Sequence, residues 1–268
     1  MSFISLSPLD IGIAALLLVI NAVFSIILRL GLARQMVIAA IRMVVQLLLL
    51  GLVLKVLFDL ASPLFTSAVG LIMILFAGRE VMARQSRNLT GWWAYGLGTT
   101  TMLIAGTVVT LFALTTQIRP EPWYEARVAL PLLGMILGNT MTGIALGLDR
   151  LLTGTARERN TIEARLALGH TMTDAMSGVT RDALRSGLMP IINSMSAIGL
   201  VSIPGMMTGQ ILAGVEPMEA VKYQLLIMFL IAAGTTLGVL GSVRGAGRRL
   251  TDTRHRLRLD RMTAADGD

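Results

Sequence analysis

Long apolar runs, separated by short polar segments, make up most of this chain. A helix that crosses the hydrocarbon core of a bilayer, about 30 Å thick, needs about 20 apolar residues. Runs of this length with few charges recur seven times and predict seven transmembrane helices. In chain order these helices cover residues 11–30, 36–58, 64–82, 95–116, 130–148, 188–213 and 223–243. We therefore expect an all-α, polytopic membrane protein whose transmembrane domain occupies residues 1–243.

Composition and charge agree with a membrane protein. Hydrophobic residues make up 54% of the chain and charged residues 15%, a balance that is too apolar for an ordinary soluble domain. A net charge of +7 would raise the question of nucleic acid in a soluble protein, but a charge bias across the bilayer explains it here. We therefore expect the lipid bilayer, and no nucleic acid, as a partner. The chain has no cysteine, which excludes disulfides, thiolate metal sites and cysteine nucleophiles.

The basic residues gather on one side of the predicted helices. Eighteen of the 23 Lys and Arg residues lie in alternate connections and in the C-terminal segment, and four lie on the opposite side. The positive-inside rule then places the N-terminus outside and the C-terminus in the cytoplasm. Residues 244–268 are expected to form a basic cytoplasmic tail, which either orients the protein and faces lipid or binds a specific partner.

Strongly polar side chains are few inside the predicted helices. Arg42 and Gln46 lie four residues apart and therefore on one face of the second helix. They either reach the interface and pair helices or line a substrate pathway. The predicted helices hold no carboxylate near the membrane midplane, where a proton- or sodium-coupled transporter usually has one. The pattern therefore argues against ion-coupled transport.

The fifth and sixth predicted helices are rich in small and uncharged polar residues. Glycines spaced four apart let helix backbones approach closely in lipid, and Pro204 is expected to kink the sixth helix. Amide and hydroxyl side chains here either join neighbouring helices or line a pathway. The glycines expected at packing contacts are Gly134, Gly138, Gly143, Gly147, Gly205 and Gly209. The polar candidates are Asn139, Thr142, Asn193, Ser194 and Gln210.

One long cytoplasmic connection, at about residues 149–187, joins these two helices. Its apolar positions, which include Ile162, Met172 and Met176, approximate a helical stripe that is interrupted near Gly169. We expect one or two amphipathic helices in this connection. They either lie on the membrane surface or form a docking surface for a soluble partner.

Several segments of the chain resemble a known family. The string EARLALG places Glu163, Ala164 and Gly169 at the spacing of the cytoplasmic coupling loop of ABC transporter permeases. The longer strings GMILGNTMTGIALGLDRL and MPIINSMSAIGLVSIPGMMTGQILAG resemble the FetB family of ABC permeases, and the similarity covers residues 9–243. The resemblance implies a multi-pass permease of the inner (cytoplasmic) membrane, associated with iron export in bacteria and similar to plant permeases of aluminium tolerance. In this family the cytoplasmic loop docks a separate ATPase, which would place Glu163, Ala164, Gly169, Met172 and Met176 at the contact.

The residues themselves agree with an ATPase on another polypeptide. A P-loop, GxxxxGK[ST], wraps phosphate with backbone amides and reaches it with a lysine. Neither Lys55 nor Lys222 lies in such a motif. We therefore expect no cofactor bound directly to this chain, ATP on a separate ABC ATPase subunit, and no enzymatic activity in the chain itself. ABC architecture needs two permease halves and no half is repeated within the sequence, so we expect a permease homodimer.

The residues of the predicted helices do not identify the transported substrate. Both histidines, His170 and His255, are expected in the cytoplasm, and no cluster of carboxylates lies inside the predicted helices, so the metal ligands are unknown. The family resemblance implies export of iron or another metal by alternating access. An organic solute or a metal chelate is the alternative substrate, and an ATP-independent channel or secondary transporter is the alternative class.

Overall fold

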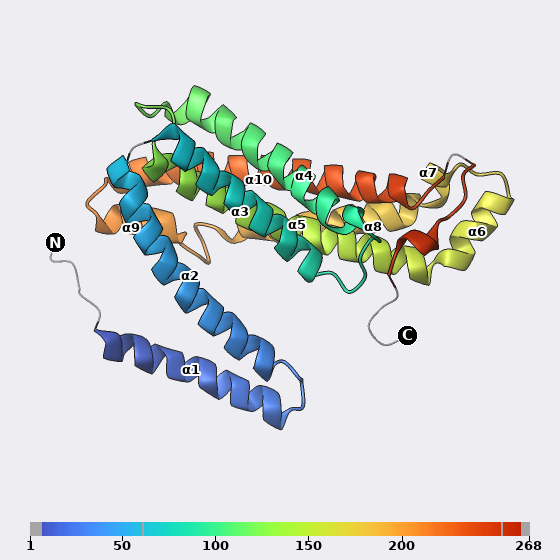
Figure 1. The fold of residues 1–268 in the computed structure, drawn as a ribbon, viewed down its shortest axis with the longest axis horizontal. Helices are drawn as coiled ribbons and strands as arrows, with labels where there is room; N and C mark the ends of the chain where they lie inside the picture. Colours follow the sequence, from blue (N-terminus) through green and yellow to red (C-terminus); the bar gives the residue numbers. More distant parts are fainter. Residues whose placement is uncertain (1–6, 61, 253, 264–268) are drawn as a thin grey trace. The chain divides into compact units, whose positions relative to one another are not determined.

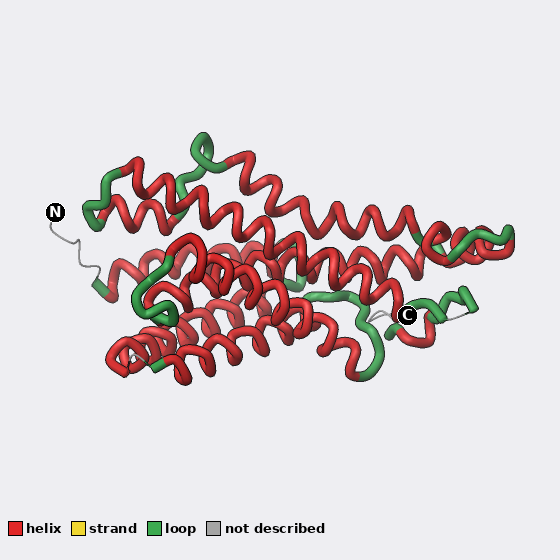
Figure 2. Tube along the Cα trace, turned by 90° about the horizontal axis from the view of Figure 1, so that it is seen from above, coloured by secondary structure: helices red, strands yellow, loops and turns green. Residues whose placement is uncertain are grey.

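The computed structural model describes residues 7–60, 62–252 and 254–263. Within these ranges the chain is almost entirely helical and contains no β-strand (Figure 2). The predicted all-α membrane fold is therefore confirmed. The chain divides into two compact units, Met1–Ala61 and Ser62–Asp268.

The first unit is a hairpin of two long apolar helices, α1 (Pro8–Ile27) and α2 (Ala33–Leu60) (Figure 1). The helix α1 begins at a capping box, in which Asp10 N donates to Ser7 Oγ and Ser7 N donates to the Asp10 carboxylate. At the turn between the helices, Leu32 N donates to Ser25 Oγ over 3.2 Å. This bond supplies a partner for a hydroxyl that would otherwise be buried without one.

The second unit is a helical bundle around one central helix, α5 (Ala126–Arg157). The helix α5 packs against α3 (Pro63–Ala83), α4 (Trp92–Phe112), α8 (Ser177–Ala197) and α10 (Pro217–Arg249). A six-residue π-helix, η1 (Ala113–Ile118), extends α4. Two buried hydrophobic clusters fill the bundle, one toward each end of α5.

Close contacts fix the directions of these helices. Along α5, a Cβ on Gly143 would approach Gly187 and Thr235, and a Cβ on Gly147 would approach Ala183 and Val243. Positions in α10 therefore rise with those in α5 while positions in α8 fall, so α10 is parallel to α5 and α8 is antiparallel. This alternation agrees with successive crossings of a membrane.

Within the described residues, six helices are long and apolar enough to cross a bilayer. They correspond to six of the seven predicted runs and cover Leu9–Ile27, Ala33–Asp59, Pro63–Ala83, Trp92–Ile118, Ala126–Arg157 and Pro217–Arg249. The predicted helix over residues 188–213 is wrong as a single span. Instead, α8 ends at Ala197, residues 198–204 are not helical, and α9 (Gly205–Leu212) follows.

The break has a local cause. Gly199 has a φ of +85°, which takes the backbone out of the helical region, and its N–H donates to Ser202 O over 3.0 Å. Pro204 has no N–H to continue a helix and instead occupies the N-cap of α9. The proline thus begins a new helix and does not kink a continuous one.

The connection predicted over residues 149–187 is shorter than expected, because the helices on both sides continue into it. The 32 residues of α5 give a length of about 48 Å, well beyond the roughly 30 Å of a bilayer core. Arg150 in α5 pairs with Asp182 in α8 over 3.6 Å, so charged side chains join the two extensions. Only residues 158–176 lie between α5 and α8, and they form α6 (Arg159–Ala167) and α7 (Met172–Ala175).

The C-terminal segment is folded onto the bundle. The helix α10 continues to Arg249, five residues past the expected start of the tail at residue 244. Residues 250–252 and 254–263, with the short η2 (Leu259–Arg261), then return to the connection between α3 and α4. There Thr90 N donates to Arg261 O over 2.9 Å and Thr263 N donates to Asn88 O over 2.8 Å.

Candidate functional site

The connection of α6 and α7, which we call the α6–α7 hairpin, protrudes at one end of the second unit (Figure 1). Ile162, Met172 and Met176 anchor it, since their side chains are only 1%, 4% and 3% exposed and belong to the main hydrophobic cluster. The docking role expected of Met172 and Met176 stays a prediction, but in this structure both side chains are covered by the bundle. Their apolar side chains face the bundle because that is where a helical stripe removes the most surface from water.

The opposite side of the hairpin is open. Glu163 and Ala164 are both exposed, and Glu163 Oε1 accepts a hydrogen bond from Arg159 Nε over 2.8 Å, one helical turn away. Glu163 thus forms an ion pair within α6. The exposed Ala164 beside it adds a small apolar side chain to this surface.

Gly169 ends α6 in a Schellman motif. Gly169 N donates to Leu166 O and His170 N donates to Arg165 O, while Gly169 has a φ of +88°. Any side chain at this position would be strained, because L-residues other than Asn and Asp rarely adopt a left-handed conformation. The spacing of EARLALG therefore encodes a helix terminated by a sharp turn.

Leu168, which the sequence analysis missed, is the most exposed apolar residue of the hairpin. Its side chain is 80% exposed, and it lies directly before Gly169, which forms the turn. With Ala164 and Ala167 it gives the tip of α6 a small apolar surface. The exposure of Leu168 could have been predicted from the sequence. Leu168 lies at the end of the helical segment and outside the apolar stripe that contains Ile162 and Leu166.

The predicted pathway residues of α5 lie on a face that no helix of the second unit covers. Asn139 is exposed and Thr142 is partly exposed, and nothing lies within 4 Å of a Cβ built on Gly138. Asn139 Nδ2 donates to Met135 O over 2.9 Å and Thr142 Oγ1 donates to Gly138 O over 3.1 Å. Their acceptor atoms remain available on this face.

The other candidates are distributed over three helices. Asn193 and Ser194 are exposed in the last turn of α8, and Gln210 in α9 has a buried Oε1 without a hydrogen-bond partner among the described residues. Arg42 and Gln46 are exposed on α2, in the first unit. Arg42 and Gln46 thus share a face of α2. Asn193 and Ser194 are neighbours near the end of α8, and Gln210 lies on a third helix.

The predicted packing glycines differ in their surroundings. A Cβ on Gly143 or Gly147 would meet α8 and α10, and a Cβ on Gly134 would lie 3.2 Å from Met73 Cε. Nothing lies within 4 Å at Gly138, Gly205 or Gly209. Close approach also occurs at glycines outside the predicted set, including Gly78, Gly98, Gly187, Gly238 and Gly245. A four-residue spacing of glycines therefore does not identify a packing contact. The contact forms only where another helix lies opposite the glycine.

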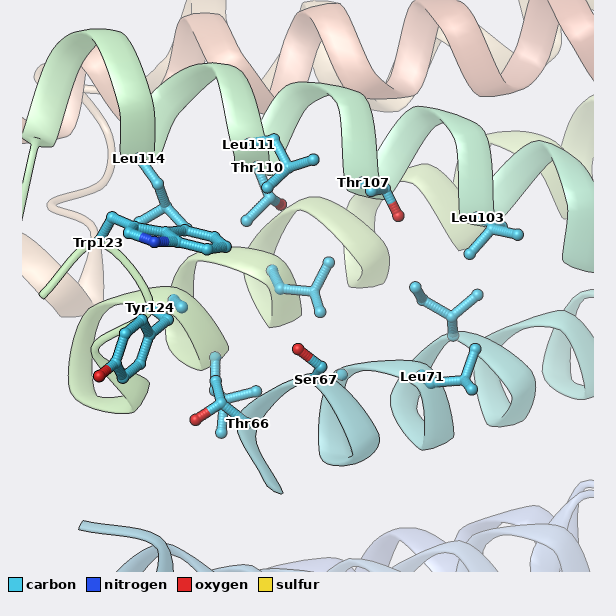
Figure 3. Close-up of a pocket in the computed structure, with 15 residues that line it drawn as sticks. Thr66, Ser67, Leu71, Leu103, Thr107, Thr110, Leu111, Leu114, Trp123 and Tyr124 are labelled. Carbon is cyan, nitrogen blue, oxygen red and sulfur yellow. The ribbon is translucent and has the colours of Figure 1, made fainter. Parts of the chain in front are cut away.

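A separate cavity of about 270 Å³ lies between α3, α4 and the start of α5 (Figure 3). Its walls are mainly apolar, the rings of Trp123 and Tyr124 lie at one end, and several hydroxyl side chains lie along its length. No residue of the predicted site lines it. As for metals, no group of three or more His, Cys, Asp or Glu lies close enough to hold an ion in the part of the chain that the structure describes.

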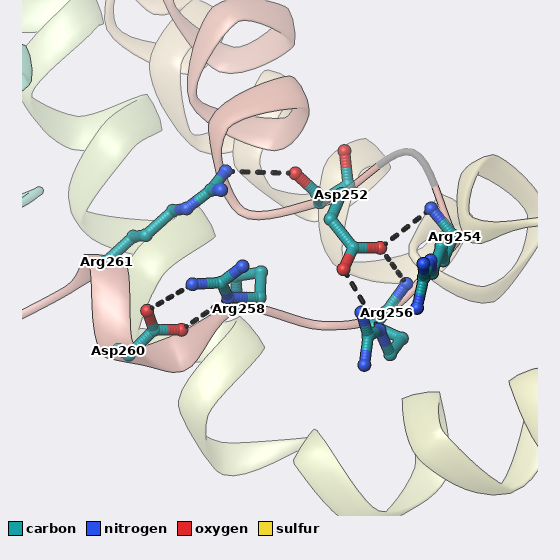
Figure 4. A network of polar contacts seen from close by, with 7 residues as sticks. Asp252, Arg254, Arg256, Arg258, Asp260 and Arg261 are labelled. Atoms are coloured by element: carbon teal, nitrogen blue, oxygen red, sulfur yellow. Dashed lines mark hydrogen bonds and ion pairs between the residues drawn. The ribbon is translucent and has the colours of Figure 1, made fainter.

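Charged side chains stabilise the returning C-terminal segment (Figure 4). Arg258 donates two hydrogen bonds to the Asp260 carboxylate, of 2.8 and 2.7 Å, and lowers the pKa of Asp260 to about 2. The pKa of Asp252 is also lowered, mainly by the backbone N–H of Arg256. Arg261 Nη1 donates to the carbonyl oxygens of Arg249 and Thr251. Two arginines of the basic tail, Arg256 and Arg258, thus form ion pairs within it.

The helical bundle, its membrane-length helices and the protruding hairpin define a multi-pass α-helical membrane protein. Residues 8–251 match the family described as "Uncharacterised protein family (UPF0014)", and the chain belongs to this family. The predicted family resemblance is confirmed, because the relatives of the chain include FetB.

Three relatives illustrate the range of the family. The chain is 38% identical to the UPF0014 membrane protein slr1647 of Synechocystis, over 79% of this chain and 81% of the relative. It is 28% identical to the "Probable iron export permease protein FetB" of Escherichia coli, over 92% and 93%. It is 31% identical to the "Protein ALUMINUM SENSITIVE 3" of Arabidopsis thaliana, over 85% and 82%. No solved structure matches the chain significantly.

Proposed function

We propose that the chain is the transmembrane subunit of an ABC transporter that exports iron or another metal from the cytoplasm. Its place in the UPF0014 family and its end-to-end similarity to a relative named as an iron export permease support this assignment. ATP is bound and hydrolysed by a separate ABC ATPase subunit. The protein then functions in the inner membrane, with the α6–α7 hairpin in the cytoplasm as the charge distribution predicts.

The observation that carries the proposal is the α6–α7 hairpin. It combines a buried anchor at Ile162 and Met172 with an exposed apolar tip at Leu168 and a fixed turn at Gly169. A partner that covers Leu168 and Ala164 removes apolar surface from water, while the anchor prevents the hairpin from moving independently of the bundle. Glu163 and Arg159 form the polar rim of this contact.

The anchored hairpin explains how force reaches the membrane. It connects α5 and α8 directly, and the two helices are locked together by the close approach of Gly143 and Gly187. When ATP closes the ATPase dimer, each hairpin moves with its ATPase, and α5 and α8 move as one body. Rocking of this kind exchanges inward-open and outward-open states of a transporter.

A homodimer provides the second permease half. The face of α5 that carries Gly138, Asn139 and Thr142 is uncovered in the second unit and holds the uncharged polar groups expected of a pathway. We assign this face to the contact between two copies. Asn139 and Thr142 then line the space through which the substrate passes.

The hairpin contact is tested by copurification with the ABC ATPase subunit. Leu168→Asp places a charge on the apolar tip and is expected to abolish copurification and ATPase stimulation. Leu200→Asp is the matched control, because Leu200 is 93% exposed and lies in the non-helical segment that follows the other end of α8. Gly169→Ala strains the turn without a clash, since nothing lies within 4 Å, and is expected to weaken the complex. Undiminished ATPase binding by Leu168→Asp would refute the docking role.

A further inference from the structure

The break between α8 and α9 lies near one end of the second unit (Figure 1). Gly143 of α5 meets Gly187 of the antiparallel α8. Ala197, which ends α8, is therefore level with about residue 133 of α5, about 10 Å inside the first residue of α5, Ala126. The length of α9 gives a similar depth, because its eight residues extend about 12 Å from the turn that joins it to α10. The break therefore lies at membrane depth, toward the side that the charge distribution predicts to be outer.

The end of α8 leaves carbonyl oxygens unpaired at this depth. Gly199 N donates within the break instead of continuing α8, and no described hydrogen bond reaches the carbonyl oxygens of Met195 and Ser196. The side chains of Asn193 and Ser194, also exposed, make no described hydrogen bond either. Irregular backbone occurs at membrane depth only where protein buries it or where it lines a water-filled cavity. The second unit leaves this end of α8 uncovered and the exposed side chains are polar, so we assign it to the water-filled pathway.

A buried carboxamide lies at the level of the break. Gln224 of α10 is only 9% exposed, and its Oε1 has no hydrogen-bond partner among the described residues. It lies one turn outside Ile227 on the buried stripe of α10. The helices α8 and α10 are antiparallel, and Val239 lies against Gly187, so Gln224 is level with about residue 202 in the break. The bundle around the break thus holds three oxygen acceptors without described donors, one from a carboxamide and two from the main chain.

The unpaired oxygens at the end of α8 suit a cation. The last carbonyl groups of a helix form the negative end of its dipole, and half-helix ends of this kind bind cations in transporters with broken helices. Carbonyl and carboxamide oxygens are hard ligands, which suit divalent ions that keep part of their hydration shell. We propose that the end of α8, together with Gln224, binds a divalent metal ion on the outer part of the export pathway. The site rests on the proposed export function and assigns neutral oxygen ligands to its substrate.

Thiol labelling tests whether the end of α8 faces water, because the chain has no cysteine of its own. In the full-length protein in liposomes, Ser196→Cys should react with a membrane-impermeant methanethiosulfonate, and faster with a cationic reagent than with an anionic one. Phe229→Cys is the control, because Phe229 is 66% exposed on α10 at a similar depth and is expected to face lipid. No labelling of Ser196→Cys, equal labelling at both positions, or a faster anionic reagent would refute the site.

Thermal unfolding of the full-length protein in detergent tests the ligand, with Mn²⁺ as the probe. Mn²⁺ is expected to raise the Tm of the wild type. Gln224→Leu removes an unpaired buried carboxamide, so it should fold at least as stably without metal and lose most of the Mn²⁺ shift. Thr235→Val is the matched control that keeps the shift, because Thr235 is also buried without a partner on α10 but lies three turns further in. No shift in the wild type, or an equal shift in Gln224→Leu, would refute the site.

Iron transport separates the site from the proposed function, because neither labelling nor Mn²⁺ binding needs ATP or the ATPase. In proteoliposomes with the ATPase subunit, Gln224→Leu should raise the KM for ferrous iron about tenfold, the loss of one contact to a charged group, and leave ATPase copurification intact. An unchanged KM would refute the site and uphold export. A wild type that binds Mn²⁺ but transports no iron would overturn the proposed function and uphold the metal site.

Discussion

Gly143 and Gly187 bring the backbones of α5 and α8 into direct contact. A Cβ on Gly143 would lie 2.8 Å from Gly187 O, and a Cβ on Gly187 would lie 2.7 Å from Gly143 O. Because both approaches involve backbone atoms, neither helix can yield by a change of side-chain rotamer. The two helices that flank the α6–α7 hairpin are therefore coupled at a point deep in the bundle.

Substitution of either glycine by alanine should separate the helices. Gly143→Ala is expected to lower the free energy of unfolding by about 1–3 kcal/mol, the usual effect of overpacking, and to lower transport further than stability alone explains. Thermal unfolding in detergent measures the first effect. Gly96→Ala is the control, because nothing lies within 4 Å of a Cβ there. A stability of Gly143→Ala equal to that of Gly96→Ala would contradict the contact.

Substitution of Met172 should destabilise the protein much more than substitution of Glu163. Met172→Ala is expected to destabilise the protein by about 2–5 kcal/mol, because the side chain is buried. Glu163→Gln removes an exposed ion pair with Arg159, which is worth about 0.2–1 kcal/mol. Thermal unfolding separates the two variants. If Met172→Ala left stability intact and abolished ATPase binding, Met172 would belong to the docking surface after all.

Acid should release the C-terminal segment. The pKa values of Asp252 and Asp260 are lowered by hydrogen bonds within the folded segment, that of Asp260 from 3.8 to about 2. Their contribution to stability is therefore complete above pH 3.8 and is lost as the pH falls toward 2. Because Arg249 lies 5.1 Å above the ring of Trp93, tryptophan fluorescence should change in this range. The Asp252→Asn, Asp260→Asn double variant should lack the transition, and a transition that persisted would have another origin.

The absence of cysteine allows the uncovered face of α5 to be tested by crosslinking. Asn139→Cys is expected to form a disulfide-linked dimer under mild oxidation, because the proposed homodimer brings this face of two copies together. Val108→Cys, an exposed position on α4, should remain monomeric. Crosslinking at Val108 in place of Asn139 would move the dimer contact to another face. Gel mobility without reductant gives the result.

Single-sequence reasoning identified what depends on length and composition. Six membrane helices follow from apolar runs alone, and the Gly169 turn follows from its place after a helical segment. The break before Pro204 was missed, since residues 198–204 are largely apolar like the helices on either side, and the left-handed φ of Gly199 could not be read from the sequence.

Other features depend on contacts between distant residues. Met172 was expected at a docking surface, yet the bundle that buries it is built from helices far away in the sequence. The pairing of Leu89 with Met262 likewise joins segments that no local pattern connects. Glycine packing also depends on distant residues. Gly143 and Gly205 are each followed by a glycine four residues later, but only Gly143 faces the backbone of another helix.

The central claim is that this chain exports a metal only when an ATPase acts on its α6–α7 hairpin. The most direct measurement is ferrous iron flux in proteoliposomes that contain the chain and its ABC ATPase subunit, with a neutral organic solute and an iron chelate as parallel substrates. The account predicts iron flux that requires ATP, is lost in Leu168→Asp and persists in Leu200→Asp. ATP-dependent flux of the chelate or the organic solute alone would reassign the substrate. Iron flux without the ATPase or ATP would contradict the account.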